Sequence, residues 1–122
     1  MDPKIPTPPM ILLWNDQPCG QILSYGYETP WASGRFEATD QALQQAWIAI
    51  GELSADVEDW PDDEPLEAAE MRWQATLARL GLSQADFDAF HAAAWAIVDG
   101  EGRHHELPAP PLFEAIFVTW RW

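Results

Sequence analysis

The chain has 122 residues and a formal net charge of −14, from 20 Asp and Glu against six Lys and Arg. Such a charge repels nucleic acid and anionic membranes, which argues against direct binding to either. Hydrophobic residues make up 48% of the chain and include eight tryptophans, so the composition suits a packed core and argues against global disorder. We expect a single domain over residues 1–122, with the proline-rich residues 1–8 loosely held.

The cysteine content and the N-terminus indicate where the protein works. Cys19 is the only cysteine, which rules out an intramolecular disulfide and a cysteine-rich zinc module. The first residues lack the basic start and the apolar stretch of a signal peptide. No apolar run approaches the roughly 20 residues that span a bilayer. These features predict a cytoplasmic protein that is not bound to a membrane.

Strand-like segments open the chain. Residues 10–14 (MILLW) are apolar, residues 15–20 (NDQPCG) are typical of a turn, and residues 21–27 (QILSYGY) resemble a second strand. This order predicts a β-hairpin. A short third strand is expected around Arg35 to Glu37, after a connection in which Pro30 and Gly34 act as turn residues.

The first long helix is expected to begin at Thr39 or Asp40, which are good N-cap residues, and to run to about Glu58. Its apolar stripe has helical spacing and comprises Leu43, Trp47, Ile50, Leu53 and Val57. Gly51 lies inside this pattern, where it weakens the helix or allows a close approach.

A second helix is predicted to begin at Asp63 or Glu64, just before Pro65, and to end at Gly81. Its apolar stripe comprises Leu66, Ala69, Trp73, Leu77 and Leu80. We expect the two helices to form an antiparallel or angled pair against a sheet.

Ser83 and Asp86 resemble a capping box that opens a third helix, ending near Ala93. Residues 94–98 are compatible with helix or strand, and we favour a strand from Trp95 to Val98. The closing segment LFEAIFVTWRW is β-rich and apolar on both faces, which predicts one interior strand. The expected fold is therefore α+β: a small antiparallel sheet, made of the N-terminal hairpin and C-terminal strands, packed against two or three helices.

Residue types that support catalysis do not form a recognisable pattern. His104 and His105 are adjacent and would point to opposite faces of a strand, so they cannot easily share a metal. No serine lies in a nucleophile motif, and nothing near Cys19 would lower the pKa of its thiol. No glycine-rich phosphate loop is present. We therefore expect no metal, no cofactor and no enzyme activity.

Acidic residues concentrate in one segment. Between Arg35 and Arg72 the sequence has eleven acids and no basic residue. Ordinary solvated surfaces mix both signs, so this imbalance favours contact with a basic protein partner over solubility alone. The candidate partner-binding residues are Asp56, Glu58, Asp59, Trp60, Asp62, Asp63 and Glu64.

Aromatic residues around one arginine form a second candidate site. Tyr25, Tyr27, Trp31 and Arg35 could line a pocket in which the arginine holds an anionic ligand. The simpler explanation is that Arg35 pairs with Glu28 or Glu37. Trp31, Trp60, Trp120 and Trp122 lie in loops or at the terminus and are candidates either for an interface or for capping the core.

The motif ETPWASGRFEAT resembles a group of small bacterial proteins with a D/E-x-PW-x-x-x-RF-x-x-T element. The matching residues are Glu28, Pro30, Trp31, Arg35, Phe36 and Thr39, with Trp120-Arg121-Trp122 at the end. The resemblance covers the first 40 residues or so well and the last 20 loosely. It implies an α+β fold and a bacterial source. Because the group has no established activity, it implies no catalytic residue.

Three functional hypotheses follow. The first is an immunity protein that neutralises a bacterial toxin by covering a basic surface. The second is a phage-encoded inhibitor or nucleic-acid mimic that acts on a defence nuclease. The third is a small ligand-binding domain or enzyme with the Tyr/Trp/Arg pocket. The first accounts best for the local concentration of acids; the oligomeric state stays open.

Overall fold

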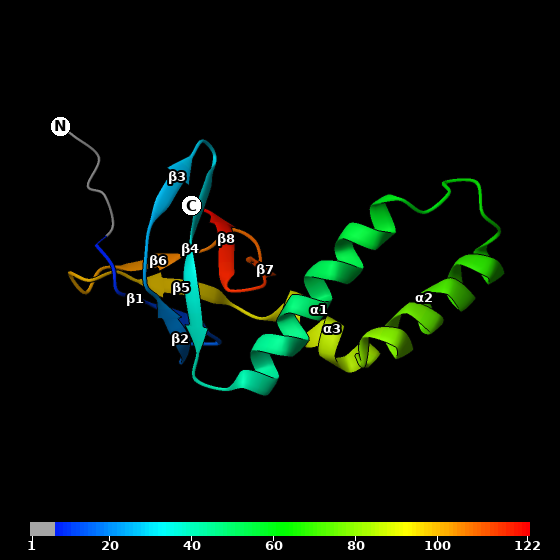
Figure 1. Ribbon diagram of the computed structural model, residues 1–122, viewed down its shortest axis with the longest axis horizontal. Coiled ribbons are helices and arrows are strands. Elements are labelled where there is room, and N and C mark those ends of the chain that lie inside the picture. The colour runs from blue at the N-terminus through cyan, green and yellow to red at the C-terminus, as the bar shows by residue number, and fades with distance from the viewer. Residues whose placement is uncertain (1–6) are drawn as a thin grey trace.

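The computed structural model describes residues 7–122. Within that range the predicted α+β class is confirmed (Figure 1). The elements in chain order are β1 (Met10–Trp14), β2 (Gln17–Ile22), β3 (Gly26–Glu28), β4 (Trp31–Ala38), α1 (Gln41–Glu58), α2 (Leu66–Leu80), α3 (Gln84–Ala92), β5 (Trp95–Val98), β6 (His104–Glu106), β7 (Leu112–Glu114) and β8 (Phe117–Arg121). Residues 1–6 of the segment that we expected to be loosely held lie outside this range. Thr7 is attached, because its carbonyl accepts a hydrogen bond from the Gly100 amide at 2.7 Å.

The strands form one antiparallel sheet that is larger than the small sheet predicted. Seven of its eight strands follow the order β6-β5-β1-β2-β4-β8-β7, and the eighth, β3, pairs with β4 beside this path. The sheet curls back on itself. His105 belongs to the edge strand β6 and Trp122 follows β8 near the other edge, yet their ring centroids are only 5.1 Å apart.

The first hairpin is present, but its turn is shorter than predicted. Only Asn15 and Asp16 form the turn, both with positive φ (51° and 64°), and residues 17–20 belong to β2 instead. Such left-handed pairs match the twist of a two-residue hairpin, and Asn and Asp tolerate them well. The turn is also tied to α3's end: the Asn15 side chain accepts a hydrogen bond from the Ala94 amide at 2.9 Å.

The second strand ends at Ile22, earlier than predicted, and Gly34 is not a turn residue. Gly34 lies in the middle of β4, where a Cβ atom would be only 2.1 Å from the Ser24 carbonyl oxygen. Glycine is therefore required for residues 23–25 to cross close to β4. After this crossing, β3 pairs with residues 31–33 of the same strand.

The C-terminal segment is a hairpin, so the prediction of one interior strand was wrong. β7 and β8 are joined by Ala115 and Ile116, and Ala115 has a φ of 47°. The alternation of Val118 and Trp120 toward the interior was visible in the sequence, but an Ala-Ile turn carries none of the usual turn residues. The strand predicted at Trp95–Val98 is confirmed.

Helix α1 is the helix that closes the core. Asp40 caps it as predicted, accepting a hydrogen bond from the Ala42 amide. Trp47 on its inner face packs against Trp95 of β5 and Phe113 of β7, each with ring centroids 5.1 Å away. Gly51 permits a close approach, because a Cβ atom there would lie 2.8 Å from the Phe113 carbonyl oxygen.

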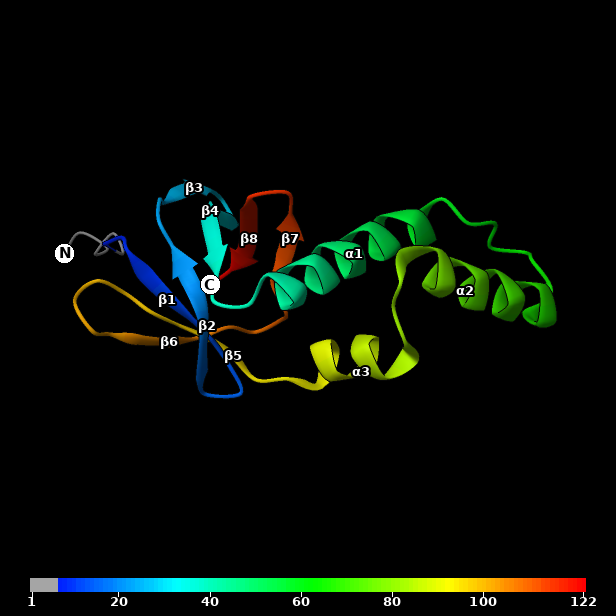
Figure 2. The same ribbon diagram turned by 60° about the horizontal axis from the view of Figure 1, so that its bottom comes forward.

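Helix α2 packs along α1 rather than against the sheet, which corrects the prediction of a helix pair lying on the sheet. Figure 2 shows α2 and the outer half of α1 projecting away from the strands. Leu66, expected in the apolar stripe, is 86% exposed, whereas Leu77 is buried. The capping box of α3 at Ser83 and Asp86 is present, and Gly81 ends α2 with a φ of 70°.

Among residues 7–122, no helix combines the length and apolarity that crossing a membrane requires.

Candidate functional site

The acidic segment forms the outer end of a helical arm. We define the arm as residues 52–80, which comprise the second half of α1, the connection and α2, and the arm tip as residues 56–64. In Figures 1 and 2 the connection between the helices lies at the end of the molecule opposite the strands. The seven predicted partner-binding residues therefore do come together at one protruding end of the molecule.

Two of the tip carboxylates are neutralised within the arm. Glu64 accepts hydrogen bonds from Arg72 Nε and Nη2, the shorter at 2.8 Å, and Asp56 lies 2.9 Å from Arg79 Nη2. The other four acids have no ion pair among residues 7–122, and all four are exposed: Glu58, Asp59, Asp62 and Asp63. The tip thus presents a compact group of uncompensated negative charges.

The position of these charges on α1 is unfavourable for the helix itself. The last turn of α1 contains no basic residue, and Asp56, Glu58 and the C-cap residue Asp59 all lie near its C-terminus. The helix dipole places partial negative charge there, so acids at this end destabilise the helix. Of these three acids only Asp56 is paired within the described residues, through Arg79, so Glu58 and Asp59 remain unfavourable for the helix.

Trp60 is held in place by the arm rather than projecting freely. Its ring lies edge-on to Trp73 at 6.4 Å, and the guanidinium of Arg72 lies 5.7 Å above it. Trp73 in turn packs against Phe87 of α3, with centroids 4.9 Å apart. This series of aromatic contacts gives the tip a fixed conformation, which lowers the entropic penalty of binding a partner.

The four residues of the predicted ligand pocket do not share one side of the sheet. Trp31 and Arg35 both lie on the outward face of β4. Tyr27 is the cross-strand partner of the inward-facing Ala32, so it lies on the opposite side of the sheet. Tyr25 packs beside Trp120 and accepts a hydrogen bond from Trp122 Nε1 at 3.0 Å. The predicted ion pair of Arg35 with Glu28 or Glu37 is absent from residues 7–122.

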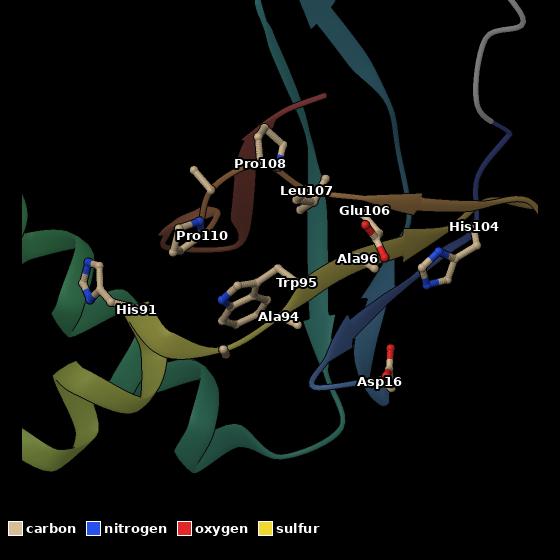
Figure 3. A pocket seen from close by; sticks show the side chains of 12 residues that line it. Asp16, His91, Ala94, Trp95, Ala96, His104, Glu106, Leu107, Pro108 and Pro110 are labelled. Atoms are coloured by element: carbon tan, nitrogen blue, oxygen red, sulfur yellow. The ribbon is translucent and has the colours of Figure 1, made fainter.

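A hollow that sequence reasoning missed lies beside strands β5 and β6. It measures about 250 Å³ and is bordered by the hairpin turn, the end of α3 and the proline-rich segment after β6 (Figure 3). His104 and Glu106 project from one face of β6, while His91 lies on the other side of Trp95. No group of three metal-ligating side chains occurs within the described range. Because these side chains do not converge, the hollow suggests no reaction.

Asp99 is the centre of a buried polar cluster between β5 and β6. Its carboxylate lies 2.9 Å from Arg103 Nε and 3.0 Å from His105 Nε2, and it accepts hydrogen bonds from the amides of Glu101 and Arg103. Burial alone would raise the pKa of Asp99, but these hydrogen bonds outweigh it and hold the pKa well below its usual range. The cluster stabilises the β5–β6 loop and supports the ring contact between His105 and Trp122.

Cys19 is an interior residue of β2 and not a turn residue as predicted. Burial raises the pKa of its thiol to about 12, and its sulfur donates to the Leu12 carbonyl at 3.4 Å. A thiol with this pKa is protonated at neutral pH and is a poor nucleophile.

The chain matched no protein-family model, no curated protein and no solved structure in the comparisons. The resemblance to small bacterial proteins with the PW-x-x-x-RF-x-x-T element therefore stays a prediction. In the structure Pro30 lies in the turn between β3 and β4, and Trp31, Arg35 and Phe36 all belong to β4.

Proposed function

We propose that this protein binds a basic protein partner through the arm tip, and that it acts as an immunity protein against a bacterial toxin. The observation that carries the proposal is the group Glu58, Asp59, Asp62 and Asp63, exposed at the end of a projecting arm without cations to balance it. A negative projection of this kind complements the basic cleft of a nuclease or deaminase toxin and accelerates association with it.

Apolar side chains beside these acids strengthen the proposal. Val57, Leu66 and Met71 on the arm are all exposed. Protein interfaces combine an apolar centre with a polar rim, and a purely solubilising acidic surface has no need of the apolar part. An arm that carries both exposed acids and exposed aliphatic side chains is suited to a folded basic protein.

A cell-protection assay tests this function. Each member of a panel of cationic nuclease and deaminase toxin domains is expressed in bacteria with and without this protein. We expect the protein to restore growth against at least one domain of the panel and to co-purify with it. Failure to neutralise or bind any domain of the panel would contradict the proposal.

The nucleic-acid mimic is the second candidate, and it makes a different prediction. A mimic reproduces the spacing of phosphates and competes with DNA for a defence nuclease. The arm tip gathers its charges at one end, and Arg72 and Arg79 neutralise two of the carboxylates in the segment. Inhibition of a nuclease that disappears when excess DNA is added would favour the mimic over the immunity protein.

A further inference from the structure

The two arginines that lack an ion pair within residues 7–122 lie on one surface, at opposite ends of a pair of strands. Arg72, Arg79 and Arg103 are each paired with a carboxylate, whereas Arg35 and Arg121 are not. Arg35 belongs to β4 and Arg121 to β8, and these strands are direct neighbours in the sheet. The chain has a net charge of −14, yet neither arginine is paired with a carboxylate among the described residues.

Exposed aromatic residues lie next to these arginines. Trp31 is 49% exposed and is the cross-strand partner of Arg121, and Phe117 is 51% exposed and is the cross-strand partner of Arg35. The intervening Ala32, Val118 and Trp120 point inward and are buried. We define the β4–β8 face as the outward side of these two strands, carrying Trp31, Ser33, Arg35, Phe117, Thr119 and Arg121.

The order of residues on the β4–β8 face is self-complementary. An aromatic and an arginine occupy each end of the strand pair, and the order is reversed between the ends. When a second copy is rotated by 180° about an axis in the interface parallel to the strands, Trp31 faces Arg121 and Phe117 faces Arg35 of that copy. When the axis lies in the interface but runs perpendicular to the strands, Trp31 instead faces Arg35 of the second copy and Phe117 faces its Arg121. In both arrangements every aromatic meets an arginine.

Part of this arrangement is already formed within one chain. The guanidinium of Arg121 lies 5.7 Å from the ring of Trp31. Glu28 is the cross-strand partner of Trp31, and Glu114 is that of Phe117, so carboxylates border the face on both sides. A second copy would supply each arginine with an aromatic ring and a nearby carboxylate, which are its two preferred partners.

We propose that the β4–β8 face is the interface of a symmetric homodimer. The β4–β8 pairing spans five residue pairs on two strands, which is small beside the interfaces of stable complexes. The dimer is therefore weak and concentration-dependent. It leaves the arm tip of each copy free, so the inference is independent of the function proposed above.

Sedimentation velocity tests the dimer. The wild type is measured from about 1 to 100 µM beside a face variant, Trp31→Thr with Phe117→Thr, and a control variant, Tyr27→Thr. Tyr27 is 55% exposed on the adjacent β3 but is the cross-strand partner of the inward-facing Ala32. We expect the wild type and the control to shift from 13.8 kDa toward twice that mass, whereas the face variant stays monomeric across the range. Arg35→Glu alone should raise the dissociation constant at least about tenfold.

Several results would overturn the dimer. A wild type that stays monomeric at the highest concentration would do so, as would loss of the dimer in the Tyr27→Thr control. Association that disappears when Asp59, Asp62 and Asp63 are changed to Asn, or that proceeds beyond a dimer, would indicate contact between the arm of one copy and the sheet of the next. A monomeric wild type that binds oligo(dT) through Arg35 and Arg121 would assign the face to single-stranded nucleic acid instead. Circular dichroism of every variant verifies that the fold is retained.

Discussion

Two regions of the molecule treat apolar side chains differently. The first region is the sheet together with the inner half of α1, and the second is the helical arm. In the sheet region, large aromatic side chains such as Trp47, Trp95 and Phe113 are buried against one another. In the arm, Leu66 and Met71 are exposed and acids accumulate at a helix terminus that disfavours them. Burial explains the first region. The second is the surface that we propose for binding another protein.

Replacing one tryptophan in each region should give the largest difference in the free energy of unfolding. Trp47→Ala should lower the free energy of unfolding by about 3–5 kcal/mol, because Trp47 is 3% exposed and contacts Trp14, Trp95 and Phe113. Trp60→Ala, at the half-buried tip, should lower it by less than about 2 kcal/mol. Urea unfolding followed by circular dichroism measures both values. Equal losses would mean that the arm is as much a part of the cooperative core as the sheet.

Substitutions at two glycines test the close crossing of residues 23–25 over β4 in the sheet region. Gly34→Ala should lower the free energy of unfolding by about 1–3 kcal/mol, because the new methyl group would overlap the Ser24 carbonyl. Gly26→Ala is the matched control, since its Cβ atom would meet the Ser33 hydroxyl at an ordinary 3.6 Å. We expect the control to change stability by no more than about 0.5 kcal/mol. An equal effect of both substitutions in urea unfolding would contradict the crossing at Gly34.

The Asp99 cluster gives the stability of the sheet region a pH dependence. The lowered pKa of Asp99 means that folding favours its ionised form. Its contribution to stability is therefore complete above the ordinary carboxyl pKa of about 4 and is lost as the pH falls further. Asp99→Asn should lower the melting temperature by several degrees at pH 7, and the gap to the wild type should narrow below about pH 4. A gap of constant size across this range would contradict the role given to the carboxylate.

Neutralising acids on the arm should change stability least among these variants, and it should raise stability instead of lowering it. Glu58→Gln with Asp59→Asn removes negative charge from the C-terminal end of α1 and should raise the free energy of unfolding by about 0.3–1 kcal/mol at low salt. High salt should reduce this gain by screening. The same change in Glu28 and Glu37, which lie on strands, is the control and should give no comparable gain. Thermal melts at two salt concentrations measure the difference, and a loss of stability in the arm variant would contradict an arm shaped for binding.

Local patterns predicted most helix ends because the signals for these ends are local, although α2 begins at Leu66 with Pro65 at its N-cap and not at Asp63 or Glu64 as predicted. Asp40, Ser83 with Asp86, and Gly81 have the predicted roles in capping. The sheet was less predictable. Asn15-Asp16 is a turn that could be recognised, but its length is set by the register of β1 with β2, and the Ala115-Ile116 turn has no turn-forming residue. Contacts between distant segments decided these points.

The candidate site likewise combines features that the local sequence predicts with features that depend on contacts between distant segments. The acidic segment could be located from charge alone, because its residues are consecutive and meet at one end of the arm. The internal pairing of Glu64 with Arg72 and of Asp56 with Arg79 depends on how the helices align. The β4–β8 face could not be anticipated, since Arg35 and Arg121 are 86 positions apart and share a face only through the register of β4 and β8.

One binding measurement tests the role of the arm tip most directly. It compares the affinities of two matched charge variants for a toxin domain that the wild-type protein neutralises in cells. Asp59, Asp62 and Asp63 changed to Asn remove three charges from the tip, and Asp16→Asn, Asp88→Asn and Glu106→Gln remove three exposed charges elsewhere. Calorimetry at low salt should show binding weakened roughly tenfold or more by the tip variant and only slightly by the control. Equal weakening by both variants would show that only net charge matters, and would contradict the arm tip as the binding surface.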